Sequence, residues 1–197
     1  AKLHVPLDLV ITKKIGHPRN PEYAICAVGE TGPPVCNQRE LEHVDPKWFE
    51  AELQRVRTEI RRRKELYQTS SKNKMLDEKT AILVDDGIAT GFTMMAAIYE
   101  IKARNPKKIV VAVPVTPLDT AQEIQAMGVE LAALAVEENY LGAMSQLNLK
   151  ENSLCIDRLQ CIRLFVINAE QCLVVQILAL RYSATRVLIL ETTQTGK

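Results

Sequence analysis

The chain has 197 residues, which is enough for one domain with a sizeable hydrophobic core. Its formal net charge is +1 with 25% charged residues, so no overall electric field indicates nucleic acid or a membrane surface as a partner. No apolar run is long enough to cross a bilayer, and no signal-peptide pattern is present. These features predict a globular, cytoplasmic protein.

The cysteines favour the same setting. They are odd in number, widely spaced and without a Cys-x-x-Cys pair, so the sequence predicts neither a zinc site nor a disulfide framework. Free thiols are typical of reducing compartments. A reducing, cytoplasmic environment is therefore expected for all five, Cys26, Cys36, Cys155, Cys161 and Cys172.

The first strand pattern covers residues 7–12 and ends at Lys13 and Lys14. Residues 15–21 contain a glycine, two prolines and an asparagine without periodicity, and are predicted to form a loop. Two lysines at a strand end beside a loop suit a pyrophosphate, and they equally suit a solvated strand end. Residues 22–28 are apolar enough for a short strand or a short helix.

A long helix is predicted for residues 46–68. Phe49, Leu53, Val56 and Ile60 recur at the three- and four-residue steps of one helix face. The basic run at residues 61–64 would suit nucleic acid, but no aromatic side chains interleave it. A solvated helix face is the preferred interpretation of this run.

Residues 81–95 are the most informative stretch. Four apolar residues predict a buried strand, and Asp85 and Asp86 follow it directly. A loop of small residues then leads to a helix expected to begin at Met94, with Thr93 near its N-cap. Such a strand, loop and helix can hold a phosphate, because backbone N–H groups and the helix dipole favour an anion. The two aspartates would repel a phosphate, so they suit sugar hydroxyls or a divalent cation.

Further strands are predicted for residues 108–115 and 129–136, with a helix between them. Strands that alternate with helices, without hairpin signals, predict a parallel α/β sheet. Ligands of such sheets bind beyond the carboxyl ends of the strands. One pocket at that edge is expected to gather Asp85, Asp86, Lys13, Lys14, Thr116 and Glu137.

Residues 82–93 read Ile-Leu-Val-Asp-Asp-Gly-Ile-Ala-Thr-Gly-Phe-Thr. This segment resembles the motif with which type I phosphoribosyltransferases bind phosphoribosyl diphosphate (PRPP): apolar residues, two acidic residues, and a small-residue loop ending in Thr-Gly-x-Thr. Every defining position matches. Residues 13–30 are also similar to those of an uncharacterised bacterial subgroup of phosphoribosyltransferase-domain proteins. The resemblance implies an α/β, parallel-sheet, Rossmann-like phosphoribosyltransferase domain.

The resemblance also implies roles for individual residues. Asp85 and Asp86 would accept hydrogen bonds from the ribose hydroxyls, and Lys13 and Lys14 would assist the departing pyrophosphate. Mg²⁺ would be held mainly through PRPP, with no metal site made by the protein alone. Tyr140 is the candidate for contact with a base, and ordinary packing of its ring is an equal alternative. The phosphorylated sugar would be bound by Gly87, Ala89, Thr90, Gly91, Phe92 and Thr93.

The resemblance covers residues 1–144, and we expect this domain to lack the family's N-terminal strand and pyrophosphate loop. Residues 145–197 match nothing in the family, and their apolar stretches fit a helix and a strand or an irregular extension. The implied reaction transfers a phosphoribosyl group from PRPP to a nucleobase or related nitrogen acceptor and releases pyrophosphate. Neither nucleic acid nor a membrane is an expected partner, and an oligomer of identical chains is compatible with the sequence.

Two other interpretations remain open. The same fold serves in regulators that sense PRPP without catalysis; an attached DNA-binding segment would favour that role, and we identify none in the sequence. Alternatively, Asp85 and Asp86 cap turns in an α/β domain that binds no ligand. The number of motif positions that coincide argues against this last interpretation.

Overall fold

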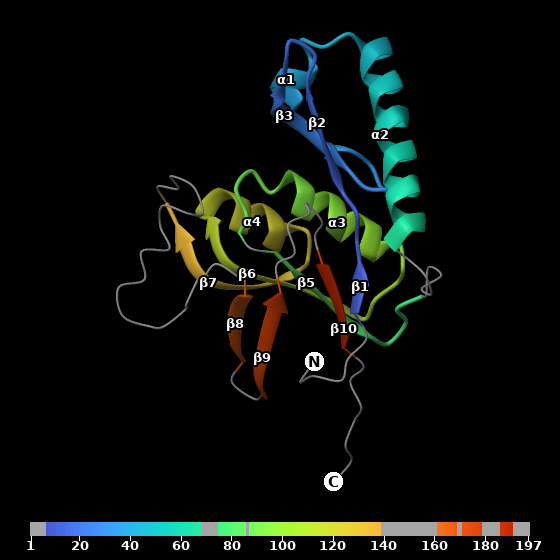
Figure 1. Ribbon diagram of the computed structural model, residues 1–197. Helices are drawn as coiled ribbons and strands as arrows, with labels where there is room; N and C mark the ends of the chain where they lie inside the picture. The colour runs from blue at the N-terminus through green and yellow to red at the C-terminus, as the bar shows by residue number, and fades with distance from the viewer. Residues whose placement is uncertain are drawn as a thin grey trace.

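The computed structural model describes residues 7–67, 75–85 and 87–138, and the backbone of three later strands. These later strands are β8 (Cys161–Asn168), β9 (Gln171–Leu178) and β10 (Arg186–Leu190). The strands form a five-stranded main sheet, a three-stranded small sheet that stands above it, and the β8–β9 hairpin (Figure 1).

The main sheet has the strand order β1-β10-β5-β6-β7. As the sequence predicts, β5 (Thr80–Val84), β6 (Lys108–Pro117) and β7 (Glu130–Glu137) are parallel. The fifth strand of the main sheet, β10, runs antiparallel to both of its neighbours, β1 (Leu7–Leu9) and β5. β10 comes from the segment for which the sequence left a strand or an irregular extension open.

Despite the reversed strand, the carboxyl ends of β1 and β5 lie at the same edge of the main sheet. Leu9 and Val84, the last residues of these strands, both lie opposite Arg186 of β10. The carboxyl end of β6 meets the same edge, because Val84 pairs with Ala112 and β6 continues for five more residues to Pro117. This edge is where a ligand of an α/β sheet is expected.

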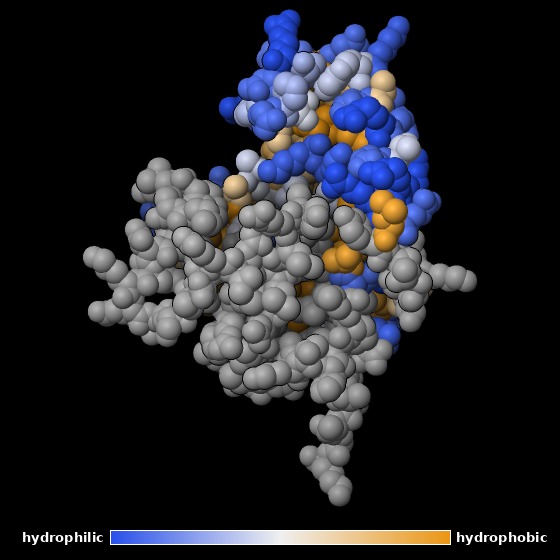
Figure 2. Space-filling view, viewed as in Figure 1, coloured by the Kyte–Doolittle hydropathy of each residue, from blue (hydrophilic) through white to orange (hydrophobic). Residues whose placement is uncertain are grey.

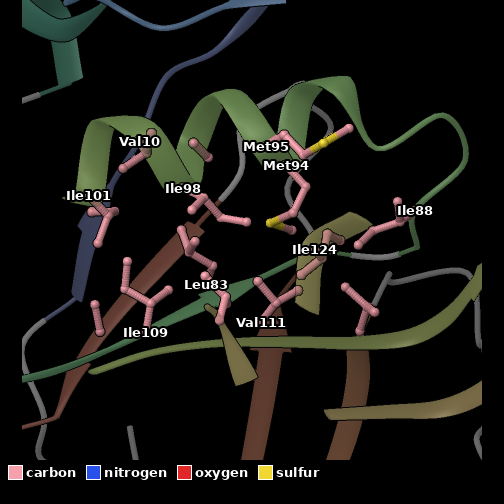
Figure 3. Close-up of a cluster of buried hydrophobic side chains, with 14 of the residues drawn as sticks. Val10, Leu83, Ile88, Met94, Met95, Ile98, Ile101, Ile109, Val111 and Ile124 are labelled. Carbon is pink, nitrogen blue, oxygen red and sulfur yellow. The ribbon is translucent and has the colours of Figure 1, made fainter. Parts of the chain in front are cut away.

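Two helices, α3 (Phe92–Lys102) and α4 (Leu118–Ala126), cover one face of the main sheet (Figure 1). The strands β5 and β6 supply alternate apolar residues to this face, as the two-residue period of a strand requires. Figure 3 shows the resulting core between α3 and the strands, which includes Val10, Leu83, Ile88, Met94, Met95, Ile98, Ile101, Ile109, Val111 and Ile124.

The small sheet is antiparallel and contains β2 (Lys13–His17), β3 (Asn20–Val28) and β4 (Val35–Cys36). The predicted loop at residues 15–21 is therefore wrong, and a hairpin forms although the sequence shows no hairpin signal. Residues 13–28 form a hairpin whose two-residue turn is Pro18 and Arg19. The His17 ring accepts a hydrogen bond from the Arg19 N–H at 3.1 Å, a local contact that supports the turn.

A β-bulge in this hairpin explains how its apolar residues are buried. Ile15 pairs with Cys26 and Gly16 pairs with Ala24, so Ile25 is an extra residue on β3. A bulge brings two neighbouring side chains toward one face of a sheet. Ile25 and Cys26 accordingly belong to one buried cluster.

The second core lies between the small sheet and α2 (Pro46–Tyr67), which follows the short helix α1 (Gln38–Leu41). The predicted helix face is confirmed, because Leu53, Val56 and Ile60 are buried there. On the face shown in Figure 2, the surface of this part of the molecule is mostly hydrophilic. No helix in the described part of the chain is both long and apolar enough to cross a membrane.

Cys26 and Cys36 form a disulfide between β3 and β4. The prediction that the cysteines are unpaired is wrong for these two, because pairing depends on strand register and β4 places Cys36 directly opposite Cys26. The argument from the cysteines for a reducing environment no longer holds. The side chains of Cys155, Cys161 and Cys172 lie outside the described residues.

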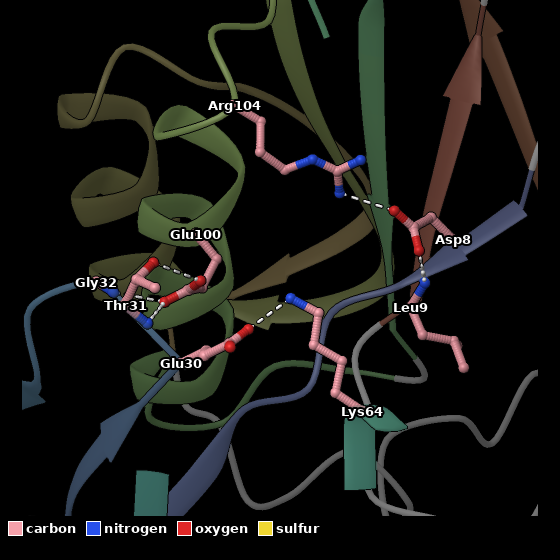
Figure 4. A network of polar contacts seen from close by, with 8 residues as sticks. All are labelled: Asp8, Leu9, Glu30, Thr31, Gly32, Lys64, Glu100 and Arg104. Atoms are coloured by element: carbon pink, nitrogen blue, oxygen red, sulfur yellow. Dashed lines mark hydrogen bonds and ion pairs between the residues drawn. The ribbon is translucent and has the colours of Figure 1, made fainter. Parts of the chain in front are cut away.

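The carboxylate of Glu100 on α3 ties the small sheet to the main sheet (Figure 4). It accepts hydrogen bonds from the Thr31 N–H at 2.7 Å, the Thr31 hydroxyl at 3.0 Å and the Gly32 N–H at 2.5 Å. Glu30 beside this turn forms an ion pair with Lys64 of α2. The turn after β3 is therefore held from both helices.

A second polar contact lies just beyond the same, C-terminal end of α3. Arg104 and Asp8 of β1 form an ion pair at 2.8 Å, with side chains that are only 14% and 8% exposed. Asp8 also accepts a hydrogen bond from the Leu9 N–H at 2.8 Å. A buried ion pair with an additional hydrogen bond chiefly enforces geometry, because desolvation offsets much of its attraction.

The basic run on α2 is largely engaged within the helix, as a solvated face predicts. Glu59 accepts hydrogen bonds from Arg62 at 2.8 and 3.0 Å and from Arg63 at 2.8 Å. These hydrogen bonds, that from Arg62 first, lower the pKa of Glu59 from 4.5 to about 2. A lowered pKa stabilises the folded protein above pH 4.5, and this contribution disappears as the pH falls toward 2.

We predict that Glu100→Ala lowers the free energy of unfolding by about 1–3 kcal/mol, because two N–H groups and a hydroxyl lose a charged acceptor. Urea unfolding at pH 7 measures the change. Glu123→Ala, at an exposed position of α4, is the matched control and should change stability by less than about 0.5 kcal/mol. Equal effects of the two substitutions would contradict the role of Glu100.

We also predict that Glu59→Gln is less stable than the wild type at pH 7. The difference should shrink as the pH falls from 4.5 toward 2, where the wild-type carboxylate also loses its charge. Urea unfolding across this range measures both curves, with Glu65→Gln on the exposed side of α2 as the control. A difference that stays constant down to pH 2 would argue against ionic pairing of Glu59.

Candidate functional site

The candidate site begins where β5 ends. Val84 is buried, and the next residue, Asp85, is half-buried at the carboxyl edge of the main sheet. Asp86 lies outside the described residues. The chain then continues from Gly87 through a short loop into α3.

The loop at residues 87–91 is anchored on its inner side. Ile88 inserts its side chain into the main core, and its N–H donates to the carbonyl of Val115 on β6 at 3.0 Å. The carbonyl of Ala89 accepts a hydrogen bond from the Thr120 hydroxyl of α4 at 3.1 Å. Ala89 and Thr90 are exposed. The loop therefore presents one side to solvent and is fixed on the other.

α3 begins at Phe92, two residues earlier than predicted, with Gly91 as its N-cap. Gly91 adopts a left-handed conformation with φ of 73°, which glycine accepts readily, and its carbonyl accepts the first helical hydrogen bond from the Met95 N–H. Thr93 is the second residue of the first turn, and so lies near the N-cap as the sequence predicts.

The N-terminus of α3 is suited to an anion. No side-chain hydrogen bond caps the helix at Gly91, and the first turn contains no acidic residue. The first amides of a helix have no partner within the helix and carry partial positive charge. Phe92 and Thr93 are half-buried here.

Lys13 and Lys14 begin β2 and do not end a strand, so their expected location is wrong. Lys13 pairs with Val28, which is buried against α2, and is itself half-buried. Burial lowers the pKa of Lys13, the charge of Arg63 lowers it further, and Glu59 partly offsets both effects. Lys13 therefore lies close to the charged side chains of α2.

Lys14 lies on the opposite face of the small sheet. It pairs with Ala27, which in turn pairs with Val35 of β4. Val35 packs against the core of the main sheet, so this face is the one turned toward the main sheet. Lys14 is exposed, and of the two lysines it is the one placed on that side.

The other residues that the sequence places at the site differ in exposure where the structure describes them. Thr116 is fully buried within β6, contrary to the expectation that it lines the site. Glu137 is partly exposed at the end of β7, and Tyr140 lies outside the described residues. Among the described residues, no group of three or more His, Cys, Asp or Glu side chains could hold a metal ion.

Sequence reasoning missed Val115 and Thr120, which hold the loop. Their contact with the loop could have been inferred from the order of the strands and helices along the chain. β6 and α4 follow the motif directly in the chain, and β6 is the parallel neighbour of β5. The end of β6 and the start of α4 must therefore lie beside the loop after β5.

Gly91 and Gly128 allow a matched test of the site's packing. Both have φ of +73°, but a Cβ at Gly91 would lie 2.5 Å from Cγ2 of Thr120, whereas a Cβ at Gly128 meets nothing within 4 Å. We predict that Gly128→Ala costs about 1–2 kcal/mol from backbone strain alone and that Gly91→Ala costs more. Urea unfolding measures the difference; equal costs would show that the loop yields freely to the added methyl group.

Three comparisons with known proteins agree with this geometry. The family described as "Phosphoribosyl transferase domain" matches residues 1–139. Two proteins of Mycobacterium tuberculosis, from strains CDC 1551 / Oshkosh and H37Rv, both carry the name "Putative phosphoribosyl transferase". Each is 35% identical to this chain over 135 residues, which is 68% of this chain and 30% of the relative.

The crystal structure of TT1426 from Thermus thermophilus is also similar. It is 35% identical in sequence, and the likeness covers 70% of this chain and 66% of that chain with a TM-score of 0.52. By contrast, the match covers less than a third of the length of the two Mycobacterium tuberculosis proteins. Because the family match extends over most of its residues, the chain belongs to the phosphoribosyl transferase domain family.

Proposed function

We propose that this chain binds PRPP and transfers its phosphoribosyl group to a nitrogen of a nucleobase or related acceptor, with release of pyrophosphate. The observation that carries the proposal is the anchored loop at residues 87–91, which joins a strand-end carboxylate, Asp85, to a helix start free of acidic side chains. Membership of the family supports the same reaction class.

The phosphate of the sugar would bind at the start of α3. The first helical hydrogen bond runs from the Met95 N–H to Gly91, so the amides of residues 91–94 precede the helical ladder. The hydroxyls of Thr90, which is exposed, and Thr93, which is half-buried, would add donors. Gly87, Ala89, Gly91 and Phe92 would contribute backbone contacts.

Asp85 would accept hydrogen bonds from the ribose hydroxyls, and Asp86 is assigned the same role by the motif. A carboxylate beside the sugar also favours the positive charge that develops on the ribose ring as pyrophosphate leaves. The bond from the anomeric carbon to the pyrophosphate oxygen breaks, and a bond to the acceptor nitrogen forms.

Lys14 is the stronger candidate for contact with pyrophosphate. Its face of the small sheet is turned toward the main sheet, whereas Lys13 is surrounded by the ionic side chains of α2. Contact of Tyr140 with the acceptor stays a proposal that rests on the resemblance alone.

Mg²⁺ fits the residues at the strand end. It prefers oxygen ligands and is usually bound through one or two carboxylates together with substrate phosphates and water. The ion would be held mainly through PRPP, and no self-sufficient metal cluster occurs among the described residues. When bound, the ion would neutralise charge on the departing pyrophosphate.

The decisive experiment is a screen for PRPP-dependent release of pyrophosphate across purine and pyrimidine bases, with and without Mg²⁺, combined with calorimetric binding of PRPP. Release with a particular base supports the transferase. Binding of PRPP without release for any base would overturn catalysis and favour a PRPP-sensing module. Absence of both binding and release would overturn the proposed function.

We predict that Asp85→Asn weakens PRPP binding roughly 10- to 100-fold, because a charged acceptor of ribose hydroxyls is lost. Adding Asp86→Asn should abolish measurable binding while circular dichroism still reports a folded chain. Glu123→Gln on the exposed side of α4 is the control and should bind PRPP as the wild type does. Unchanged calorimetric affinity of Asp85→Asn would contradict its contact with ribose.

A further inference from the structure

Thr120 lies outside the PRPP motif, yet it is the side chain that holds the motif's loop. It is 4% exposed in the first turn of α4. Its hydroxyl donates to the carbonyl oxygen of Ala89 at 3.1 Å, across 31 residues of sequence. The carboxylate of Asp119 is a poorer acceptor for this hydroxyl, because it lies 3.5 Å away and already accepts the Thr120 N–H at 2.7 Å.

The bond to Ala89 fixes the orientation of the following amide. A peptide group is planar and trans, so the C=O of Ala89 and the N–H of Thr90 point in opposite directions. Because the carbonyl points to α4, the Thr90 N–H points away from α4, on the exposed side of the loop. In the described part of the chain this N–H makes no backbone hydrogen bond.

The methyl group of Thr120 restrains the same loop at a second residue. Its Cγ2 lies 2.5 Å from the position that a Cβ of Gly91 would occupy. Hydroxyl and methyl therefore act on two different residues of the loop, and the Ile88 hydrogen bond to Val115 holds a third. Serine would keep the first of these contacts, and valine would keep only the second.

We propose that Thr120 is a positioning residue of the phosphate-binding loop, whose hydroxyl turns the Thr90 amide toward the phosphate of the sugar. This inference rests on the proposed function, because it assumes that the loop binds a phosphorylated pentose. It adds that one hydrogen bond from α4 prepares a donor before the ligand arrives. Preorganised donors gain affinity because no ordering cost remains at binding.

The test compares Thr120→Val, Thr120→Ser and Thr120→Ala with the wild type, using ribose 5-phosphate as the calorimetric probe. Thr120→Val should weaken binding roughly 3- to 10-fold, as expected for one lost neutral hydrogen bond, and Thr120→Ser should bind within about 2-fold of the wild type. In ¹⁵N spectra the Thr90 amide should shift in the ligand-free valine variant and keep its position in the serine variant. With PRPP, the valine variant should raise KM more than it lowers kcat.

Thr58→Val is the matched control. The Thr58 hydroxyl also donates to a backbone carbonyl, that of Gln54 at 2.9 Å, but it lies on the exposed surface of α2. This variant should bind ribose 5-phosphate as the wild type does. A similar loss of affinity in Thr58→Val would show that the effect is global and would overturn the assignment.

The outcomes separate the inference from the proposed function. If the wild type binds no ribose 5-phosphate, the proposed function fails and the inference fails with it. If the wild type binds and folded Thr120→Val binds equally well, only the inference fails. If Thr120→Val does not fold, serine against alanine decides: tighter binding by Thr120→Ser supports the role of the hydroxyl, and equal binding overturns it.

Discussion

The site depends on a loop whose two ends are buried in one core. Leu83 in β5 is 0% exposed, Ile88 in the loop is 3% exposed, and Met94 in α3 is 1% exposed, and all three belong to the same core. Three buried side chains within twelve residues leave the intervening backbone little freedom. The inward polar groups of the loop must then find partners, and β6 and α4 supply them. What remains for a ligand is the outward side, with exposed residues and the start of α3.

The small sheet makes a different contribution. It has its own core against α2, and its turn at residues 30–32 is held by Glu100 and Lys64. The pleat of β2 separates two neighbouring lysines, one toward α2 and the other onto the face shared with Val35. Lys13 and Lys14 are adjacent in sequence but lie in two different environments. Of the two, Lys14 is on the side that faces the main sheet, where the substrate would bind.

Sequence predicted the elements whose pattern is local. The apolar runs of β5 and β6, the buried face of α2, and the strand, loop and helix within residues 81–95 could all be read from spacing. The β2–β3 hairpin was not predicted, because glycine and prolines are typical of loops and because its bulge interrupts the two-residue period of a strand. The Cys26–Cys36 bond and the contact of Thr120 with Ala89 were not predicted, because both depend on how separate elements lie against each other. Asp86 and Tyr140 lie outside the described residues.

The disulfide closes a covalent ring around the turn that joins the two sheets. Residues 26–36 form this ring, and Glu30, Thr31 and Gly32 lie within it. A closed ring has fewer conformations when the chain is unfolded, so its contacts cost less entropy to form. Attachment of the small sheet to α3 is thereby linked to the redox conditions around the protein. Reduction of the disulfide would open the ring and give more conformational freedom to the turn that Glu100 and Lys64 hold.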